Sequence, residues 1–332
     1  MSTIRLLDVA GLFHPTWRVK ESAGRPIGEA AAETVQVLRE RAAAGGADYV
    51  VACCDSGRCF RHDIALEYRA TDPDYRGYKG NRPERDAALI AALDRVIDNL
   101  EQDGVPVFRA PGFEADDILA TLATWATAQG HDVEIVSDDK DLRQLVGPAM
   151  ALTAPDGSQV QYGGVSVVKR DGEVIGPAEV KARFGVDPHQ LGEYLAMVGD
   201  TSDHIKGIPG IGDKKAAAML ATYGTFAAIF EAAEKDAEYV AECECKLALA
   251  REEKVRPLPT FAKPKFQNAT RASILSSRAL FEISLRLTRL RTDVPVDFAA
   301  VTAPRVPKPK PHSEAWRARS AKLAASADEP ID

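Results

Sequence analysis

The first half of the chain alternates short apolar runs with amphipathic stretches. The apolar runs fall at residues 4–7, 49–53, 105–108 and 133–136, and the amphipathic stretches at 28–44, 87–102 and 115–129. Short apolar runs bounded by polar residues indicate buried strands, and strands that alternate with helices are typical of a parallel sheet. The pattern therefore predicts an α/β fold with a twisted parallel sheet flanked by helices.

Acidic residues cluster just after these runs. Nine carboxylates form five clusters: Asp8; Asp55; Glu114, Asp116 and Asp117; Asp139 and Asp141; Asp200 and Asp203. The carboxyl ends of parallel strands meet at one edge of a sheet, so the first four clusters are expected to gather there. Like charges at close range raise one another's pKa, and bound cations remove that cost. Mg²⁺ prefers oxygen ligands, so the pattern indicates a metal-dependent phosphodiesterase.

The net charge of −7 does not exclude a nucleic-acid partner. The chain has 49 acidic residues against 42 Lys and Arg, and without the nine clustered carboxylates the two signs nearly balance. The basic residues can therefore be concentrated locally.

The five cysteines indicate a reducing compartment. Their number is odd and their spacing does not fit a zinc site, and Cys53 lies within an apolar run. The N-terminus enters an expected strand at once, and no run of about 18 apolar residues occurs. We therefore expect a soluble, cytoplasmic, unexported protein without membrane contact.

A basic segment without regular periodicity, residues 56–86, interrupts the α/β pattern and is called the arch segment below. Its cations are Arg58, Arg61, Arg69, Arg76, Lys79, Arg82 and Arg85, and Phe60, Tyr68, Tyr75 and Tyr78 stand among them. A connection of this length in a compact domain is usually functional or mobile. We expect it to be mobile without a ligand; the alternative is an ordinary solvated face.

The second half of the chain predicts a different organisation. Residues 165–175, with Asp171-Gly172 at their centre, predict a β-hairpin. Beyond Pro177 the pattern is helical to about Arg291, and Pro, Lys, Arg and Ser dominate the C-terminus. We therefore expect an α/β domain over 1–176, a helical region over 177–300 and a disordered tail over 301–332.

The segment from Gly207 to Ala216 reads Gly-Ile-Pro-Gly-Ile-Gly-Asp-Lys-Lys-Ala, a helix-hairpin-helix signature. Gly207, Gly210 and Gly212 would let backbone N–H groups approach a phosphate, and the following helix would offer its positive end. Lys214 and Lys215 would add charge to a contact that holds a DNA backbone without reading its sequence. The alternative is a helix C-cap followed by a turn.

Three further blocks carry a resemblance to a known family. They are Gly112-Phe113-Glu114-Ala115-Asp116-Asp117-Ile118-Leu119, then Asp139-Lys140-Asp141-Leu142, then Leu195-Ala196-Met197-Val198-Gly199-Asp200-Thr201-Ser202-Asp203. In this order they resemble the 5' nuclease domain of bacterial DNA polymerase I, a member of the flap endonuclease family. The similarity runs from about Ile4 to Phe298 and includes Tyr78-Lys79-Gly80-Asn81-Arg82-Pro83. It implies a PIN-like 5' nuclease fold with a helical arch, in stand-alone form.

The resemblance also implies roles for individual residues. Asp8, Asp55, Glu114 and Asp116 would form a first metal site, and Asp117, Asp139, Asp141, Asp200 and Asp203 would hold or tune a second, with the division left open. The ions would be Mg²⁺, with Mn²⁺ as a substitute, and K⁺ is a candidate at the hairpin. Lys79 and Arg82 would grip the scissile phosphate, with Arg58, Arg61, Arg76 and Tyr78 as DNA-binding neighbours.

The implied function is a structure-specific 5' nuclease, both 5'-3' exonuclease and flap endonuclease, in DNA replication or repair. Its partner would be DNA with a 5' flap, a nick or a 5' single-stranded end; we expect a monomer with a functional link to polymerase and ligase. The alternatives are a catalytically weak DNA-junction-binding protein, a PIN-type ribonuclease and a small-molecule phosphatase. Departures from the family lie in two places. Near the first strand, Val9 stands where a small residue is usual, and His14 and Pro15 stand where a Tyr-Arg pair is usual; later, His204 replaces the usual asparagine and Lys215 the usual threonine.

Overall fold

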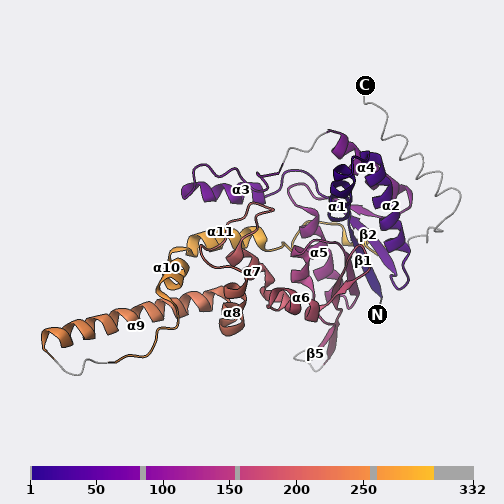
Figure 1. The fold of residues 1–332 in the computed structure, drawn as a ribbon. Coiled ribbons are helices and arrows are strands. Elements are labelled where there is room, and N and C mark those ends of the chain that lie inside the picture. The colour runs from indigo at the N-terminus through magenta and orange to yellow at the C-terminus, as the bar shows by residue number, and fades with distance from the viewer. Residues whose placement is uncertain (1, 83–86, 154–157, 255–259, 303–332) are drawn as a thin grey trace. The chain divides into compact units, whose positions relative to one another are not determined.

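The computed structural model describes residues 2–82, 87–153, 158–254 and 260–302. The chain divides into two compact units, drawn in Figure 1. Among the described residues, unit 1 comprises 2–60, 87–153, 158–181 and 290–302, and unit 2 comprises 61–82, 182–254 and 260–289. Apart from Val301 and Thr302, the expected C-terminal tail lies outside the described residues, as do positions 83–86 of the arch segment.

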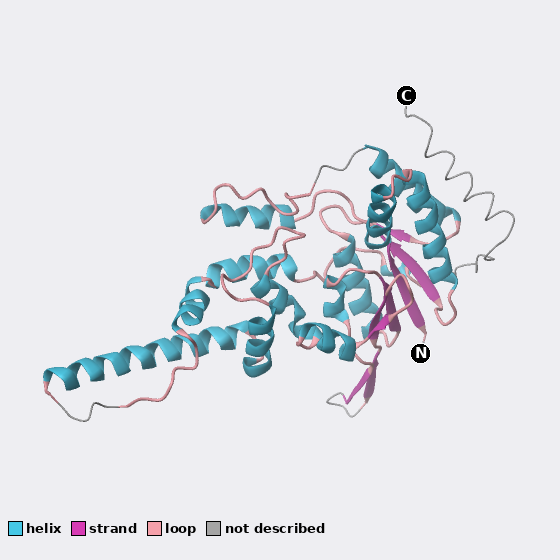
Figure 2. Cartoon of the chain, viewed as in Figure 1, coloured by secondary structure: helices cyan, strands magenta, loops and turns pink. Residues whose placement is uncertain are grey.

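Unit 1 contains a six-stranded sheet, seen as arrows in Figure 2. Its strands are β1 (Thr3–Asp8), β2 (Tyr49–Cys53), β3 (Val107–Phe108), β4 (Asp132–Val136), β7 (Val165–Val168) and β8 (Val174–Ile175), in the order β3-β2-β1-β4-β7-β8. All neighbouring pairs are parallel except β7 with β8. The predicted parallel sheet is confirmed, and the predicted hairpin is β7 and β8.

Helices cover both faces of this sheet. Side chains alternate across each strand, and Leu7, Ala52 and Val136 belong to a buried cluster with three helices: α1 (Val9–Ser22), α2 (Ile27–Ala43) and α4 (Ala87–Gln102). Helix α5 (Ala115–Ala128) packs against β1, β2 and β4 and buries Ile118, Leu119 and Leu122. Short 3₁₀ helices, η2 (Asp141–Leu145) and η4 (Phe298–Ala300), complete the unit.

Helix α1 was not expected from the sequence. Pro15 stands inside it and Gly11 one turn earlier, and both residues are poor formers of helix interiors. The helix forms because Val9, Leu12 and Phe13 are buried against the sheet. Tertiary burial outweighs local propensity here.

A second hairpin, β5 (Met150–Thr153) and β6 (Gln159–Tyr162), was also not expected. Its apolar residues Met150 and Leu152 are about half exposed, at 49% and 50%. Residues 154–157 between the strands lie outside the described part.

Unit 2 is helical, as the sequence predicts. It contains α3 (Arg61–Ala65), η1 (Leu66–Ala70), η3 (Pro188–Gln190), α7 (Leu191–Val198), α8 (Asp213–Tyr223), α9 (Phe226–Glu252), α10 (Asn268–Ser276) and α11 (Arg278–Thr288). Helix α6 (Pro177–Phe184) crosses the boundary between the units. Within unit 2, α11 packs against α7 and α3, and Phe226 stacks on Phe281.

The arch segment is more regular than its sequence indicates. It contributes α3 and η1 to unit 2, and Tyr68, Tyr75 and Tyr78 are buried with 0%, 2% and 6% exposure. The Tyr68 hydroxyl pairs with that of Ser284 at 2.8 Å. The expected mobility of this segment before ligand binding stays a prediction.

Two further expectations concern cysteines and membranes. All five cysteines are free, and Cys53, Cys54 and Cys59 are buried. Burial raises the pKa of the Cys54 thiol to about 12, so this thiol stays protonated at neutral pH. None of the described helices is by itself long and apolar enough to cross a membrane. Helices α8 and α9 reach that length and apolarity only when counted together, and they are bent by 88° relative to each other.

Candidate active site

Asp8 lies where β1 ends and α1 begins. Its Oδ1 atom accepts a hydrogen bond of 2.8 Å from the Gly11 backbone N–H, and its Oδ2 atom accepts one of 2.6 Å from the Ser137 hydroxyl. A Cβ atom on Gly11 would come within 1.9 Å of Oδ2, so only glycine leaves room for the carboxylate in this position. The side chain is 2% exposed. Asp8 is therefore both the helix N-cap and a fixed, buried carboxylate.

Ser137 links Asp8 to the next carboxylates. Its hydroxyl oxygen accepts a hydrogen bond of 3.0 Å from the Asp139 backbone N–H, while Asp139 Oδ1 accepts one of 2.8 Å from the Asp141 N–H. Ser137 directly follows β4, the strand next to β1. The parallel register thus brings the ends of β1 and β4 together, as predicted for Asp8, Asp139 and Asp141.

Asp55 and Glu114 surround the start of α5. Asp55 follows β2, and its Oδ1 atom accepts a hydrogen bond of 3.0 Å from the Ala115 N–H. Glu114 is the N-cap residue and is 7% exposed, while Asp116 in the first turn is half-buried. The positive end of α5 stabilises carboxylates at this point. The positive end of α5 therefore explains part of the position of these acids.

Asp117 has a different environment from its neighbours. One oxygen accepts a hydrogen bond of 2.9 Å from the Arg291 N–H and the other accepts one of 3.3 Å from the Glu114 N–H. The side chain is fully buried. Asp117 therefore ties the residue 290–294 segment of unit 1 to the start of α5.

The electrostatics of unit 1 fit a divalent cation. Burial raises the pKa of Asp8 to about 7; the bonds from Ser137 and Gly11 lower it, and the charges of Asp139 and Asp55 raise it further. The donors around Asp8 are carboxylate oxygens, the ligands preferred by hard divalent ions. A cation at this edge would favour the charged form of Asp8 against its burial and against the charges of Asp139 and Asp55.

Asp200 and Asp203 lie in unit 2, on the turn after α7. Asp200 Oδ1 accepts hydrogen bonds from the Ser202 backbone N–H at 2.8 Å and the Ser202 hydroxyl at 2.7 Å. Its backbone exchanges two hydrogen bonds with that of Ile205. Asp200 and Asp203 are 7% and 9% exposed, so the turn holds both as buried carboxylates.

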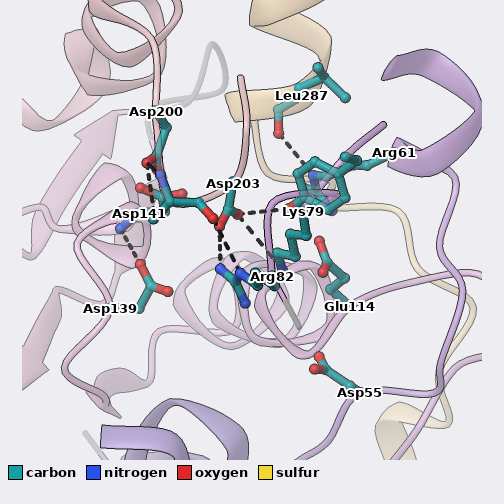
Figure 3. A network of polar contacts seen from close by, with 12 residues as sticks. Asp55, Arg61, Lys79, Arg82, Glu114, Asp139, Asp141, Asp200, Asp203 and Leu287 are labelled. Carbon is teal, nitrogen blue, oxygen red and sulfur yellow. Dashed lines mark hydrogen bonds and ion pairs between the residues drawn. The ribbon is translucent and has the colours of Figure 1, made fainter. Parts of the chain in front are cut away.

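Three arch residues contact the Asp203 carboxylate, as Figure 3 shows in part. The Arg82 guanidinium donates to Oδ1, the Tyr78 hydroxyl donates to Oδ2 at 3.0 Å, and the Lys79 ammonium lies 3.7 Å from Oδ2. The predicted catalytic cations thus share one carboxylate within unit 2. Tyr78, predicted to bind DNA, is buried with its hydroxyl on Asp203.

The remaining arch arginines differ in exposure. Arg61 is 2% exposed and donates to the backbone carbonyls of Leu287 at 2.9 Å and Arg289 at 3.3 Å. The dashed line between Arg61 and Leu287 in Figure 3 marks the first of these bonds. Arg61 therefore anchors α3 at the end of α11, whereas Arg58 and Arg76 are exposed.

Close backbone approach explains the glycines of the hairpin. A Cβ atom on Gly207 would meet the Val198 carbonyl oxygen at 2.2 Å, and the next residue, Ile208, donates its N–H to the Met197 carbonyl at 2.8 Å. Gly210 has a φ of +74°, which favours glycine. Gly212 precedes α8 as its N-cap residue.

The two hairpin lysines, Lys214 and Lys215, are exposed in the first turn of α8. The Lys215 ammonium donates to the Gly210 carbonyl at 2.9 Å. The hairpin therefore has a cationic side chain bonded to its own backbone.

Sequence reasoning missed Gly11 and Ser137. Gly11 leaves room for the Asp8 carboxylate, Ser137 bonds both to Asp8 and to the Asp139 N–H, and neither residue type signals a site by itself. The available signal was position: Gly11 lies three residues after a strand-ending aspartate, and Ser137 directly follows an apolar run. Small residues at such positions permit close contacts between neighbouring strand ends.

Carboxylates gathered at the end of a parallel sheet, together with a glycine-rich helical hairpin, define the class of metal-dependent nucleases. The family comparison is specific. Residues 6–185 match the model described as 5'-3' exonuclease, N-terminal resolvase-like domain, and residues 186–311 match 5'-3' exonuclease, C-terminal SAM fold. The chain belongs to the 5'-3' exonuclease family, whose members are metal-dependent hydrolases, and the resemblance deduced from its motifs is confirmed.

Curated relatives include DNA polymerase I of two bacteria. The Rhizobium leguminosarum protein is 33% identical over 243 residues, which cover 73% of this chain and 19% of that protein. The Deinococcus radiodurans protein is 35% identical over 176 residues, which cover 53% of this chain and 16% of that protein. The chain thus matches less than a fifth of the length of these two relatives.

Solved structures share the fold. A bacteriophage T5 D15 flap endonuclease in a complex with DNA and metal ions has a TM-score of 0.58 and 19% identity, covering 97% of this chain and 99% of that one. The catalytic core of Rad2 in complex with DNA substrate has a TM-score of 0.54 and 15% identity, covering 98% and 93%. At these identities the likeness establishes the fold.

Proposed function

We propose that this protein hydrolyses DNA phosphodiester bonds at 5' ends and near junctions of single and double strands, with two divalent ions. The observation that carries the proposal is the buried Asp8, held by Gly11 and Ser137 among Asp55 and Asp139 at the carboxyl edge of the sheet. Family membership supports the reaction type.

The carboxylates are proposed to hold the ions. Asp8, Asp55, Glu114 and Asp116 are assigned to one ion, and Asp139, Asp141, Asp200 and Asp203 to the other; Asp117 is assigned a supporting role because both its oxygens accept backbone hydrogen bonds. Mg²⁺ is the proposed ion, and Mn²⁺ should substitute. When bound, such ions lower the pKa of the attacking water and stabilise the leaving oxygen.

Lys79 and Arg82 are proposed to bind the phosphate that is cut. Both carry a full positive charge, and a charge-assisted contact to a phosphate oxygen is among the stronger hydrogen bonds. Their present partner is the carboxylate of Asp203. A phosphate is an anionic acceptor like the Asp203 carboxylate, so both cations can exchange one for the other. Charge that develops on the phosphate would then be stabilised by cations already in position.

The hairpin is proposed to hold the duplex through its backbone. Its glycines, the N-terminus of α8, Lys214 and Lys215 all suit phosphate contacts without base recognition. Arg58 and Arg76 are exposed and suit further backbone contacts. We further propose a K⁺ ion at the hairpin. The Lys215 ammonium already donates a hydrogen bond to the Gly210 carbonyl there.

Cleavage of defined substrates tests the proposal. The substrates are end-labelled 5'-flap duplexes, nicked duplexes, single strands and an RNA strand, each with Mg²⁺, Mn²⁺ or a chelator. We expect metal-dependent cutting near the junction and at 5' ends of DNA. Binding without cutting would support the junction-binding alternative, and preferential cutting of RNA would support the PIN-type ribonuclease.

A variant series separates chemistry from binding. Asp139→Asn and Asp116→Asn should each lower the turnover by about a hundredfold or more while the Kd for DNA changes little, since a mispositioned ion costs transition-state stabilisation. Asp98→Asn, an exposed carboxylate on α4, is the matched control and should cut normally. Undiminished turnover of both site variants would contradict the metal assignment. The role in replication or repair, the monomeric state and the link to polymerase and ligase belong to the same proposal.

A further inference from the structure

Two non-glycine residues with positive φ, Lys79 and His204, lie in unit 2. Lys79 has a φ of +56° and His204 a φ of +60°, and only one other described non-glycine residue, Lys254, shares this conformation. Residues other than glycine adopt this region uncommonly, and asparagine, aspartate and histidine are the ones enriched there. Such backbone persists only where the surrounding contacts determine it.

The contacts that determine it join residues 75–82 to residues 200–204, a pair of segments called the arch clamp below. The Lys79 N–H donates to the Asp203 carbonyl at 2.9 Å, and the Asn81 side chain donates to the Thr201 carbonyl at 2.6 Å. Arg82 Nε donates to the Ser202 carbonyl at 3.2 Å. Backbone carbonyls of three consecutive residues thus accept bonds from one short stretch of the arch.

His204 closes the clamp from the other side. A carbonyl can only accept, so Nδ1 of His204 donates to the Gly77 carbonyl, at 2.9 Å. The imidazole stacks on the Tyr75 ring with centroids 4.6 Å apart, and the Tyr75 hydroxyl donates to the His204 carbonyl at 2.6 Å. Gly77 itself has a φ of +100°, so this turn requires glycine.

Buried aromatic packing supports this end of the clamp. Tyr75 packs edge-on against Tyr68, with centroids 4.9 Å apart, and the Lys206 ammonium lies 5.4 Å from the Tyr75 ring centroid. Lys206 also pairs with Asp72 at 2.6 Å. Tyr75 is therefore a fixed platform, and His204 is fixed by stacking on it.

We propose that His204 is a positioning residue that holds the arch clamp together and so presets Lys79 and Arg82 on Asp203 before DNA arrives. It does so through the Gly77 carbonyl and the Tyr75 ring, which set the path of the chain into Lys79. The inference rests on the proposed function, in which Lys79, Arg82 and Asp203 take part. It opposes the sequence-based expectation that the arch orders only on DNA binding.

The first test measures order without any reaction. Hydrogen exchange by mass spectrometry compares the peptide that spans residues 75–82 in the wild type, His204→Gly, His204→Asn and His189→Asn. Glycine permits the positive φ but removes the imidazole and frees the backbone, whereas asparagine keeps a donor, a Cβ and tolerance of this φ. His189 is an exposed histidine of the same unit.

The peptide should exchange slowly in the wild type and in His189→Asn, at least tenfold faster in His204→Gly, and at an intermediate rate in His204→Asn. Exchange in α9 and α11 should not change, which shows that unit 2 stays folded. Equal protection of this peptide in His204→Gly and the wild type would overturn the inference, and so would rapid exchange in the wild type.

The second test uses single-turnover cleavage of a 5'-flap duplex and the Kd for the same duplex. His204→Gly should lower the cleavage rate by about tenfold or more with an unchanged Kd, because misplaced groups cost rate more than binding. Asparagine should restore part of the rate. If the wild type does not cut, the proposed function is wrong, but the hydrogen-exchange result still tests whether His204 orders the arch clamp. If the wild type cuts and His204→Gly cuts at the same rate, the positioning role of His204 is wrong and the proposed function stands.

Discussion

The Ser137 hydroxyl donates a hydrogen bond of 2.6 Å to the Asp8 carboxylate, across the ends of two adjacent parallel strands. The bond favours the charged form of a carboxylate that burial would otherwise keep protonated. Only a charged carboxylate is a good ligand for a divalent ion. Ser137 therefore prepares Asp8 for metal binding without being a ligand in our assignment.

Replacement of this hydroxyl should raise the metal requirement. Ser137→Ala should shift the Mg²⁺ concentration for half-maximal cleavage upward by about tenfold, the lower end of the effect of groups that orient metal ligands. Thr124→Ala, which removes an exposed hydroxyl from α5, is the control and should leave the titration unchanged. A Ser137→Ala titration that matches the wild type would show that the hydroxyl only supports the fold.

A second prediction concerns the metal-free protein at different pH values. Burial raises the pKa of Asp8 to about 7, so the native state holds a proton that an unfolded aspartate, with a pKa near 3.9, releases. The associated stability is fully present below pH 4 and is lost as the pH rises through about 7. The loss above pH 7 amounts to roughly 4 kcal/mol at most.

Asp8→Asn removes this titration. With a chelator present, the variant should have a higher Tm than the wild type at pH 8 and no advantage at pH 4, while cleavage with Mg²⁺ should be abolished. Thermal unfolding followed by circular dichroism at the two pH values measures the difference. Asp98→Asn, exposed on α4, should show no such pH-dependent gain. A lower Tm for Asp8→Asn at pH 8 would mean that the charged form is tolerated in the native state.

The sequence predicted the alternating strands and helices of the parallel sheet. Strands such as 133–136 were visible because buried strands of parallel sheets are continuously apolar, and the carboxylates followed them by position. Helix α1 was not predicted because Pro15 and Gly11 have low helix propensity. The helix is stabilised by the burial of Leu12 and Phe13. Local pattern cannot report that contribution.

The arch segment shows a second limit of prediction. Its tyrosines stand among charged residues without an apolar pattern, yet the Tyr68 hydroxyl pairs with that of Ser284, which lies 216 residues away in the sequence. Arg61 read as a DNA contact, but it donates to carbonyls of residues more than 200 positions away. Contacts at such separations leave no periodic trace, so the clamp was beyond sequence reasoning.

A third prediction concerns the hairpin. Lys214→Ala/Lys215→Ala should weaken DNA binding equally for all sequences and reduce the slope of log K against log salt by about one to two, because each phosphate contact contributes about 0.9. Lys235→Ala/Lys246→Ala, two exposed lysines of α9, should leave the slope unchanged. Titrations at four salt concentrations with two duplex sequences measure both effects. A change in sequence preference would contradict the assigned role.

The last prediction concerns stability within unit 2. Asp236 on α9 is 4% exposed and accepts hydrogen bonds from the Lys265 N–H at 2.7 Å, the Phe266 N–H at 3.3 Å and the Arg271 guanidinium at 3.0 Å. Burial raises the pKa of this carboxyl, but these bonds outweigh burial and hold the pKa below its usual range. Its stabilising effect is therefore present above pH 4 and declines as the pH falls through the lowered pKa.

Removal of one partner should leave the other charge buried. Asp236→Ala should lower the free energy of unfolding by about 3–5 kcal/mol, measured by urea unfolding followed by circular dichroism. Asp236→Leu/Arg271→Met should cost less than the sum of the two single changes, because no charge remains unpaired. Glu231→Ala, which breaks an exposed ion pair with Lys235 on the same helix, should show no measurable change. Additive costs in the double variant would show that Asp236 acts through its backbone hydrogen bonds and not through Arg271.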